Sequence, residues 1–536
     1  MSRVATIPAN PLWRRIGAAF AAVSLVSSCA VGPNYHRPDA HVPANFAAQA
    51  TTPVNAEPKP AGDGSAAVDY ASWWRAFHDA ELESLIDRAI KANPDIQIAL
   101  DHLQAARTFE IAIVGAALPD VEASGAVGRG TGSDLSRGRA AQNLRSADTT
   151  SGLQHINVLA GFDSTWELDL FGKYRREIQA ARADYRATLA QRNAVLVSVI
   201  ADVARAYVDL RGLQMRAAVL HSAMGVLQES ARIVNERYQR GITNELDVTL
   251  ANRELAVLGS QVAPVDSEVS AAEYTIATLL GQYPEDLVAE LQSAAMIPPA
   301  PGVAQAGLPV QLLRRRPEIV QAEQELAGAT ARIGVATANL FPQIGITAAI
   351  GYQRQGLGSS PVVGQHIWSA GAGAVWPLLD FGALDAQVQI ADLRTRALLV
   401  SYRRTIQDAV KDVDTTWNGY GAQQQRLAKL GDALLASQRA VTLANERYER
   451  GLTDFLNVVD AQRQEYDIEE QYTAAQLGAA EQFIALYRSL GGGWENYQSL
   501  PPVHVPQPAV IAAFHRVLAP TRVLAPVAGS RSQVSQ

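Results

Sequence analysis

The chain has 536 residues, 48% of them hydrophobic and 18% charged, a composition that is ordinary for a folded protein and excludes a disordered one. Its formal net charge of −7 argues against nucleic acid as a partner, because nucleic-acid-binding domains are usually basic. After the N-terminus, no apolar run reaches the roughly 18 residues of a membrane-spanning helix. The length suits two or three ordinary domains, or one elongated and duplicated domain.

The N-terminus has the form of a targeting signal. Arg14 and Arg15 precede a short apolar stretch at 16–26, as in a secretory signal peptide. The single cysteine, Cys29, follows small residues, which resembles the bacterial lipoprotein signal. We therefore expect residues 1–28 to be a lipoprotein signal peptide and Cys29 to carry a covalent lipid. Since three arginines leave with residues 1–28, the mature net charge is −10.

The two ends of the mature chain differ in composition from its middle. Residues 29–67 are rich in Pro, Ala and Gly, which predicts an extended, lipid-anchored tether. Ala30 follows Cys29 in place of the aspartate that usually retains lipoproteins in the inner membrane, so the outer membrane is favoured. Residues 501–536 are rich in Pro, Val and Ala and end in a polar stretch, which predicts a mostly disordered tail.

The middle of the chain is a duplication. Segment 235–253 recurs at 445–463, as NERYQRGITNELDVTLANR and NERYERGLTDFLNVVDAQR. Nearer the start of each half the spacing between the copies is slightly larger, since Asn93-Pro94 corresponds to Arg316-Pro317. Each half predicts a helix, a proline-marked switch, a strand hairpin and a long helix. We place the two repeats at residues 68–290 and 291–500.

The long helices are indicated by apolar periodicity. From Leu196 to Val234 the apolar residues alternate spacings of three and four, which predicts a helix supercoiled against its neighbours. No proline occurs between Lys173 and Val234, so this helix is roughly 90 Å long. Periodicity alone also allows a dimeric coiled coil or a spacer.

Short segments between the helices alternate apolar residues with small or polar ones. Ile344, Ile346 and Ile350 show this pattern, which over about ten residues per strand is typical of a membrane β-barrel. Aromatic residues near the strand ends fit the girdles of such a barrel. The same alternation also fits an amphipathic hairpin of a soluble protein. The four strands are predicted at about 119–129, 154–171, 342–354 and 366–381.

The number of strands predicts an oligomer. Open sheet edges are not tolerated in lipid, and membrane barrels need about eight strands or more. Four strands per chain therefore cannot close a barrel, whereas three chains supply an even total and bring their long helices into a ring. We expect a closed cyclic homotrimer embedded in outer-membrane lipid.

Taken together, these features resemble the outer-membrane efflux family of TolC-like channels, in its OprM/NodT-like lipoprotein branch. The resemblance covers roughly residues 29–500 and rests on Cys29-Ala30-Val31-Gly32-Pro33-Asn34-Tyr35, Trp73-Trp74 with Phe77, the motif Arg-Tyr-x-x-Gly at 237–241 and 447–451, and Asp460-Ala461-Gln462. It implies a mainly α fold with a membrane β part, in which a trimeric 12-stranded β-barrel continues into a 12-helix periplasmic α-barrel. The partners it implies are a periplasmic adaptor (membrane fusion) protein and an inner-membrane pump.

The resemblance also implies a gate at the periplasmic tip, where the long helices turn back. Matched residue by residue, Tyr448, Leu456 and Asp460 take the constricting positions. Three copies of Asp460 would form a ring of carboxylates that selects cations. In the first repeat this position is Leu250, so only one half carries the charge. The helix-turn residues, with the first motif facing the adaptor, are Arg237, Tyr238, Gly241, Arg447 and Gly451.

Other function classes fit the sequence less well. The nine histidines are dispersed and no nucleophile motif stands out, so we expect no enzyme, no metal site and no cofactor besides the lipid. A structural periplasm-spanning lipoprotein would need the helices but not the alternating strands. The function we expect is an outer-membrane exit duct that passively conducts small molecules such as drugs. Metal-ion efflux and type I protein secretion stay open, because a conduit need not recognise its cargo.

Overall fold

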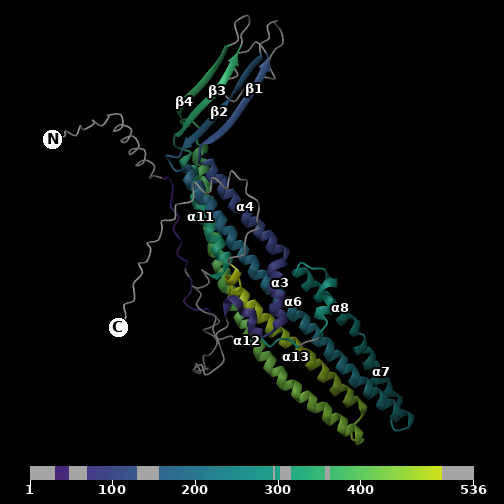
Figure 1. Ribbon diagram of the computed structural model, residues 1–536. Helices are drawn as coiled ribbons and strands as arrows, with labels where there is room; N and C mark the ends of the chain where they lie inside the picture. Colours follow the sequence, from purple (N-terminus) through teal and green to yellow (C-terminus); the bar gives the residue numbers. More distant parts are fainter. Residues whose placement is uncertain are drawn as a thin grey trace, which may run out of the picture.

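The computed structural model describes residues 30–40, 42–47, 69–129, 156–293, 296–301, 315–355 and 363–497. Figure 1 shows an elongated molecule with a β-sheet at one end and helical hairpins at the other. The helices α6 and α12 run along most of the helical part, and α3 and α8 lie near its middle. None of the described helices is both long and apolar enough to cross a membrane.

The order of elements repeats. The first half contains η1 (Tyr70–Phe77), α3 (Ala80–Ala92), α4 (Pro94–Ala116), β1 (Asp120–Arg129), β2 (Ile156–Leu168), α6 (Lys173–Gln239), α7 (Glu245–Gly259), α8 (Val262–Leu279), η2 (Pro284–Asp286) and α9 (Val288–Leu291). The second half contains α11 (Pro317–Ala338), β3 (Gln343–Gln355), β4 (Val363–Val375), α12 (Ala383–Glu449), α13 (Phe455–Ser489) and η3 (Glu495–Tyr497). Both α6 and α12 contain 67 residues, which makes each about 100 Å long.

Equivalent side chains make equivalent contacts in the two repeats. The indole of Trp166 donates to the carbonyl of Ala117 at 3.2 Å, and that of Trp376 donates to the carbonyl of Leu340 at 3.0 Å. Trp166 lies near the end of β2 and Trp376 directly follows β4, so both bonds join the end of a hairpin to the end of the helix before it. The duplication seen in the sequence is therefore a structural repeat.

The four strands form one antiparallel sheet in the order β1-β2-β3-β4. The register puts Phe162 opposite Ile350 and Ile350 opposite Trp368, so these side chains share one face. They are 60%, 65% and 78% exposed. On the other face, Ser124 donates to the carboxylate of Asp163 at 2.8 Å. The sheet thus has one apolar face and one polar face, and within the described chain the outer edges of β1 and β4 pair with no further strand.

Two strands end earlier than the sequence pattern predicted. The strand expected to reach residue 171 ends at Leu168, because the carboxylate of Asp169 instead accepts from the backbone of Tyr174 and Arg175 at the start of α6. The strand expected at 366–381 occupies Val363–Val375. It is followed by Pro377, which has no N–H to continue a ladder.

The main core lies at the middle of the helical part. Trp73 is 1% exposed and stacks on Tyr487 of α13 at 5.9 Å, and Phe77 meets Phe483 edge-on at 5.1 Å. A second cluster contains the buried Phe46, which packs with residues of α11 and α12. Part of the segment that the sequence suggested as a tether is therefore packed against the helices.

Candidate functional site

The far ends of the long helices are closed by the repeated motif. Gly241 and Gly451 both have φ of 71°, a left-handed conformation that glycine adopts without steric cost. In each repeat the glycine N–H donates to the tyrosine carbonyl of the motif, Tyr238 or Tyr448, at 2.9 Å. The next N–H donates to the carbonyl of the motif arginine at 2.9 Å. Such paired bonds end a helix and reverse the chain, so the motif builds the two tips.

Tyr448 lies inside the tip of the second hairpin. Its side chain is 9% exposed, its ring lies 5.3 Å from that of Phe455, and its hydroxyl has no hydrogen-bond partner among the described residues. The guanidinium of Arg237 lies 4.6 Å from the centre of the same ring, a cation–π contact. The two copies of the motif therefore touch each other. Arg237 faces Tyr448. Tyr448 packs in an apolar core that the two tips share, with Val234 and Ala251 of the first hairpin.

The two other residues at the expected constriction are exposed. Leu456 is 56% exposed, and the carboxylate of Asp460 binds Arg463 at 3.2 Å and Gln464 at 2.7 Å. Both lie on the first turns of α13. At the same tip Arg447 is exposed, as is Tyr238 at the tip of the first hairpin. The second hairpin thus presents an apolar and an acidic side chain on its surface.

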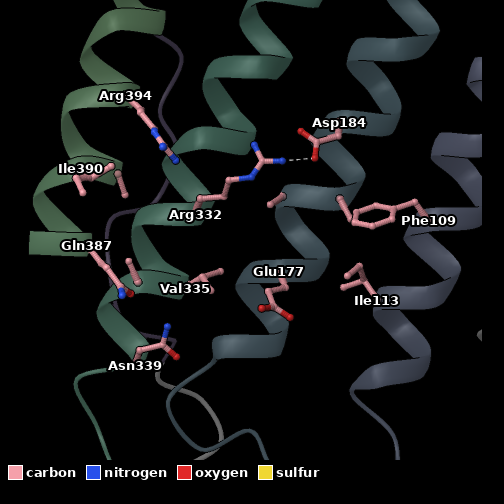
Figure 2. A pocket seen from close by; sticks show the side chains of 14 residues that line it. Phe109, Ile113, Glu177, Asp184, Arg332, Val335, Asn339, Gln387, Ile390 and Arg394 are labelled. Carbon is pink, nitrogen blue, oxygen red and sulfur yellow. Dashed lines mark hydrogen bonds and ion pairs between the residues drawn. The ribbon is translucent and has the colours of Figure 1, made fainter. Parts of the chain in front are cut away.

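A groove of about 560 Å³ crosses the four helices next to the sheet (Figure 2). Its apolar lining includes Phe109 and Ile113 of α4 and Ile390 of α12. An ion pair between Arg332 of α11 and Asp184 of α6 crosses its floor, and Arg394 and Glu177 add further charge. Burial raises the pKa of the Glu177 carboxyl. Because the lining mixes apolar groups with both signs of charge, the groove favours no single class of molecule. Its full lining is Phe109, Ile113, Glu177, Ala180, Ala181, Asp184, Arg332, Val335, Ala336, Asn339, Gln387, Ile390, Ala391 and Arg394.

A pair of carboxyl groups joins α6 to α13 in the helical part. Burial, and next the charge of Glu481, raise the pKa of Asp209 to about 7. Arg205 lies between them, 3.8 Å from Asp209 and 3.4 Å from Glu481. Near neutral pH the Asp209 carboxyl can therefore hold a proton. Among the described residues, no group of three or more His, Cys, Asp or Glu is placed to hold a metal ion.

Some expected features lie outside the described residues, namely the signal peptide 1–28, Cys29 and the tail 501–536. Other residues were missed by the sequence analysis. Arg176 and Arg211 are buried arginines of α6 that bind backbone carbonyls from distant segments. Alignment of the repeats could have singled them out, because the equivalent residues are Ala386 and Gly421.

The fold and sequence match known proteins over most of the chain. The outer membrane efflux protein family matches residues 85–282 and 308–492. Nodulation protein T of Rhizobium leguminosarum bv. trifolii is 27% identical over 471 residues, covering 88% of this chain and 96% of that protein. Toluene efflux pump outer membrane protein TtgC of Pseudomonas putida is 28% identical over 474 residues, covering 88% and 94%.

A solved structure shows the same similarity in three dimensions. The outer-membrane channel OprN superposes with a TM-score of 0.75 and 33% identity, over 87% of this chain and all of that one. The fold of long helical hairpins with a small sheet is thus shared with this channel. The chain belongs to the outer membrane efflux protein family and is an efflux channel of the outer membrane that extends into the periplasm.

Proposed function

We propose that the chain works as a homotrimer and forms the exit duct of a tripartite pump. In this assembly an inner-membrane pump and a periplasmic adaptor pass small molecules to the duct, which conducts them passively to the cell exterior. The observation that carries the proposal is the sheet, which has one exposed apolar face and two outer edges without a partner strand in the described chain. A lipid-exposed sheet must be closed, because unsatisfied backbone groups cost several kcal/mol each in hydrocarbon.

Three chains close the sheet in the simplest way. Joining β4 of one chain to β1 of the next gives a barrel of twelve strands, within the range of outer-membrane barrels. Strands of 10 to 13 residues suit the thickness of such a barrel. The same closure brings the helices of three chains into one tunnel.

The gate that we propose uses the second hairpin. Leu456 narrows the tip, and three copies of Asp460 form a ring that favours cations and opposes anions. Tyr448 lies behind them, where its contacts with Phe455 and Arg237 hold the hairpin in its closed position. Opening moves the second hairpins apart and separates the carboxylates.

The adaptor contacts the tips from the periplasm. We assign this contact to the turns, where Tyr238 and Arg447 are exposed beside Gly241 and Gly451. For the cargo we favour small organic molecules, because the similar protein TtgC is named as part of a toluene efflux pump.

Planar-bilayer conductance of the purified protein tests both the channel and the gate. We expect low, cation-selective conductance from the wild type. Asp460→Ala should raise the conductance several-fold and reduce cation selectivity. Adding Tyr448→Ala to this variant should raise the conductance further. The matched control is Leu250→Ala, at the equivalent position of the first repeat, which should leave both quantities unchanged.

Two outcomes would contradict parts of this proposal. Absence of conductance from a well-folded oligomer would reject the duct. A large conductance that Asp460→Ala does not change would keep the duct and place the gate elsewhere.

A further inference from the structure

The first described residues after the lipid-acceptor position lie in a built site on the helices. We call residues 30–37 the anchor segment. Its Val31 N–H donates to the carbonyl of Phe171 at 3.1 Å, directly after the sheet. At its other end Arg37 pairs with Glu323 of α11 at 2.8 Å. The anchor segment therefore crosses from the base of β2 to α11.

Arg176 of α6 is the centre of this site. It is 3% exposed, and its guanidinium donates to the carbonyls of Val31 and Gly32 and to the side-chain oxygen of Asn34, each at 3.0 Å. It donates also to Gln179 at 2.9 Å and to the carbonyl of Ala30 at 3.5 Å. These acceptors are all neutral oxygens. A buried cation is costly unless it is hydrogen-bonded, and here most of its acceptors belong to the anchor segment.

Close backbone contact completes the fit. Gly32 has φ of 86°, and a Cβ added to it would lie 2.5 Å from the Cα of Gly334 on α11. A Cβ added to Gly334 would in turn meet the side chain of Arg176 at 2.8 Å. The anchor segment thus sits against α11 at a point where neither glycine can be replaced without displacement.

Within the described parts of the two repeats, this site occurs once. In the other repeat the counterpart of Arg176 is Ala386, and the counterpart of Gly334 is Ile111. A Cβ on Gly382, the counterpart of Gly172, would meet nothing within 4 Å, whereas a Cβ on Gly172 would lie 2.7 Å from Ala30. Only the seam between α6 and α11 can therefore receive the anchor segment.

We propose that Arg176 is a positioning residue that holds the anchor segment, and the lipid carried on the residue before it, at the α6–α11 seam and at no other. A trimer contains six repeats and therefore six similar seams between neighbouring repeats. The lipid would lie at the three α6–α11 seams, at the base of β2. Glu177 and Asp184 line the groove, whereas Arg176 and Gln179 line a separate pocket together with Tyr35 of the anchor segment, on another side of α6. The side of α6 that binds the anchor segment and its lipid then points to the membrane around the duct, and the side that lines the groove points inward. This inference rests on the proposed lipidation of Cys29 and on the proposed trimer.

Spin labelling of the full chain tests the proposal. Cys29 is the single cysteine, and its thiol is blocked when acylated, so His36→Cys introduces one reactive thiol on the exposed side of the anchor segment. A nitroxide there should be immobile in the parent. Arg176→Gln should increase its mobility several-fold, and Arg176→Lys, which keeps the charge but not the fork of donors, should have an intermediate effect. The matched control is Arg182→Gln, because Arg182 is exposed on the same helix and pairs with Glu110 of α4.

A second variant separates a local effect from misfolding. Gly32→Val changes a residue of the anchor segment, whose new side chain would meet Gly334 of α11, and should release the label as Arg176→Gln does, with unchanged trimer yield and conductance. An immobile label in both variants would overturn the assignment of Arg176. Two labels per chain in the parent would show that Cys29 is not acylated. This would reject the lipidation of Cys29 but not the binding of the anchor segment by Arg176. Absence of conductance with the expected mobilities would reject the duct alone.

Discussion

The long helices α6 and α12 have the same length and the same ends, yet they are buried to different degrees. Of their 67 residues each, 25 are buried in α6 and 7 in α12. The difference is positional: α6 lies between α4, α11 and α13, whereas α12 lies at the edge of the helical layer. Since the two helices are repeats, the edge of α12 is where we expect the next chain of the trimer to pack.

The largest effect should come from a charge placed on that edge. Val400 is 64% exposed in the single chain, but its counterpart in α6 is the buried Ala190. Val400→Asp would bury an unpaired carboxylate in the trimer, so we expect loss of trimer while the chain still folds. Native mass spectrometry measures this. Ser401→Asp is the control, because both Ser401 and its counterpart Gln191 are exposed. A stable Val400→Asp trimer would contradict the equivalence of the two helices.

A buried cation distinguishes α6 further. Arg211 is fully buried and binds Glu81, Gln214 and the carbonyl of Ser293, whereas its counterpart is Gly421. Arg211→Met leaves Glu81 without its cation and should lower the free energy of unfolding by about 3–5 kcal/mol. Urea unfolding followed by tryptophan fluorescence measures the loss. In the double variant Glu81→Gln/Arg211→Met most of the loss should disappear, and equal losses in the single and double variants would show that Glu81 is not the cause.

The smallest effect concerns the pair of carboxyl groups between α6 and α13. Because the pKa of Asp209 is raised from 3.8 to about 7, the folded chain binds more protons than the unfolded chain between these values. Stability should therefore fall as pH rises through this window. Asp209→Asn should raise the unfolding midpoint at pH 8 and flatten its pH dependence. Asp202→Asn, which removes a pair with Arg488 at 2.9 Å, should not flatten it. An unchanged pH profile in Asp209→Asn would refute the assignment.

The sequence predicts the helices better than the site. Apolar periodicity without proline indicates the long helix, and the repeat transfers its ends to the second half. Strand ends are predicted less well. The alternation of apolar and polar residues continues past Leu168, but β2 ends there because Asp169 caps the start of α6, a contact that the alternation does not report. The contact of Arg237 with Tyr448 joins one repeat to the other, across a long stretch of sequence, so no local pattern reports it. The same reason hides Arg176, most of whose acceptors lie 142 to 146 residues earlier in the chain.

The equal lengths of α6 and α12 also constrain how such a chain can evolve. An insertion of seven residues in one helix alone would move its tip by about 10 Å relative to the other, and the two glycine turns would no longer lie at one level. A change that keeps both tips level must occur in both helices, and steps of seven residues preserve the packing register. We therefore expect relatives that cross a wider or narrower periplasm to carry matched insertions or deletions in both repeats, in the long helix and in the helix that returns from its tip.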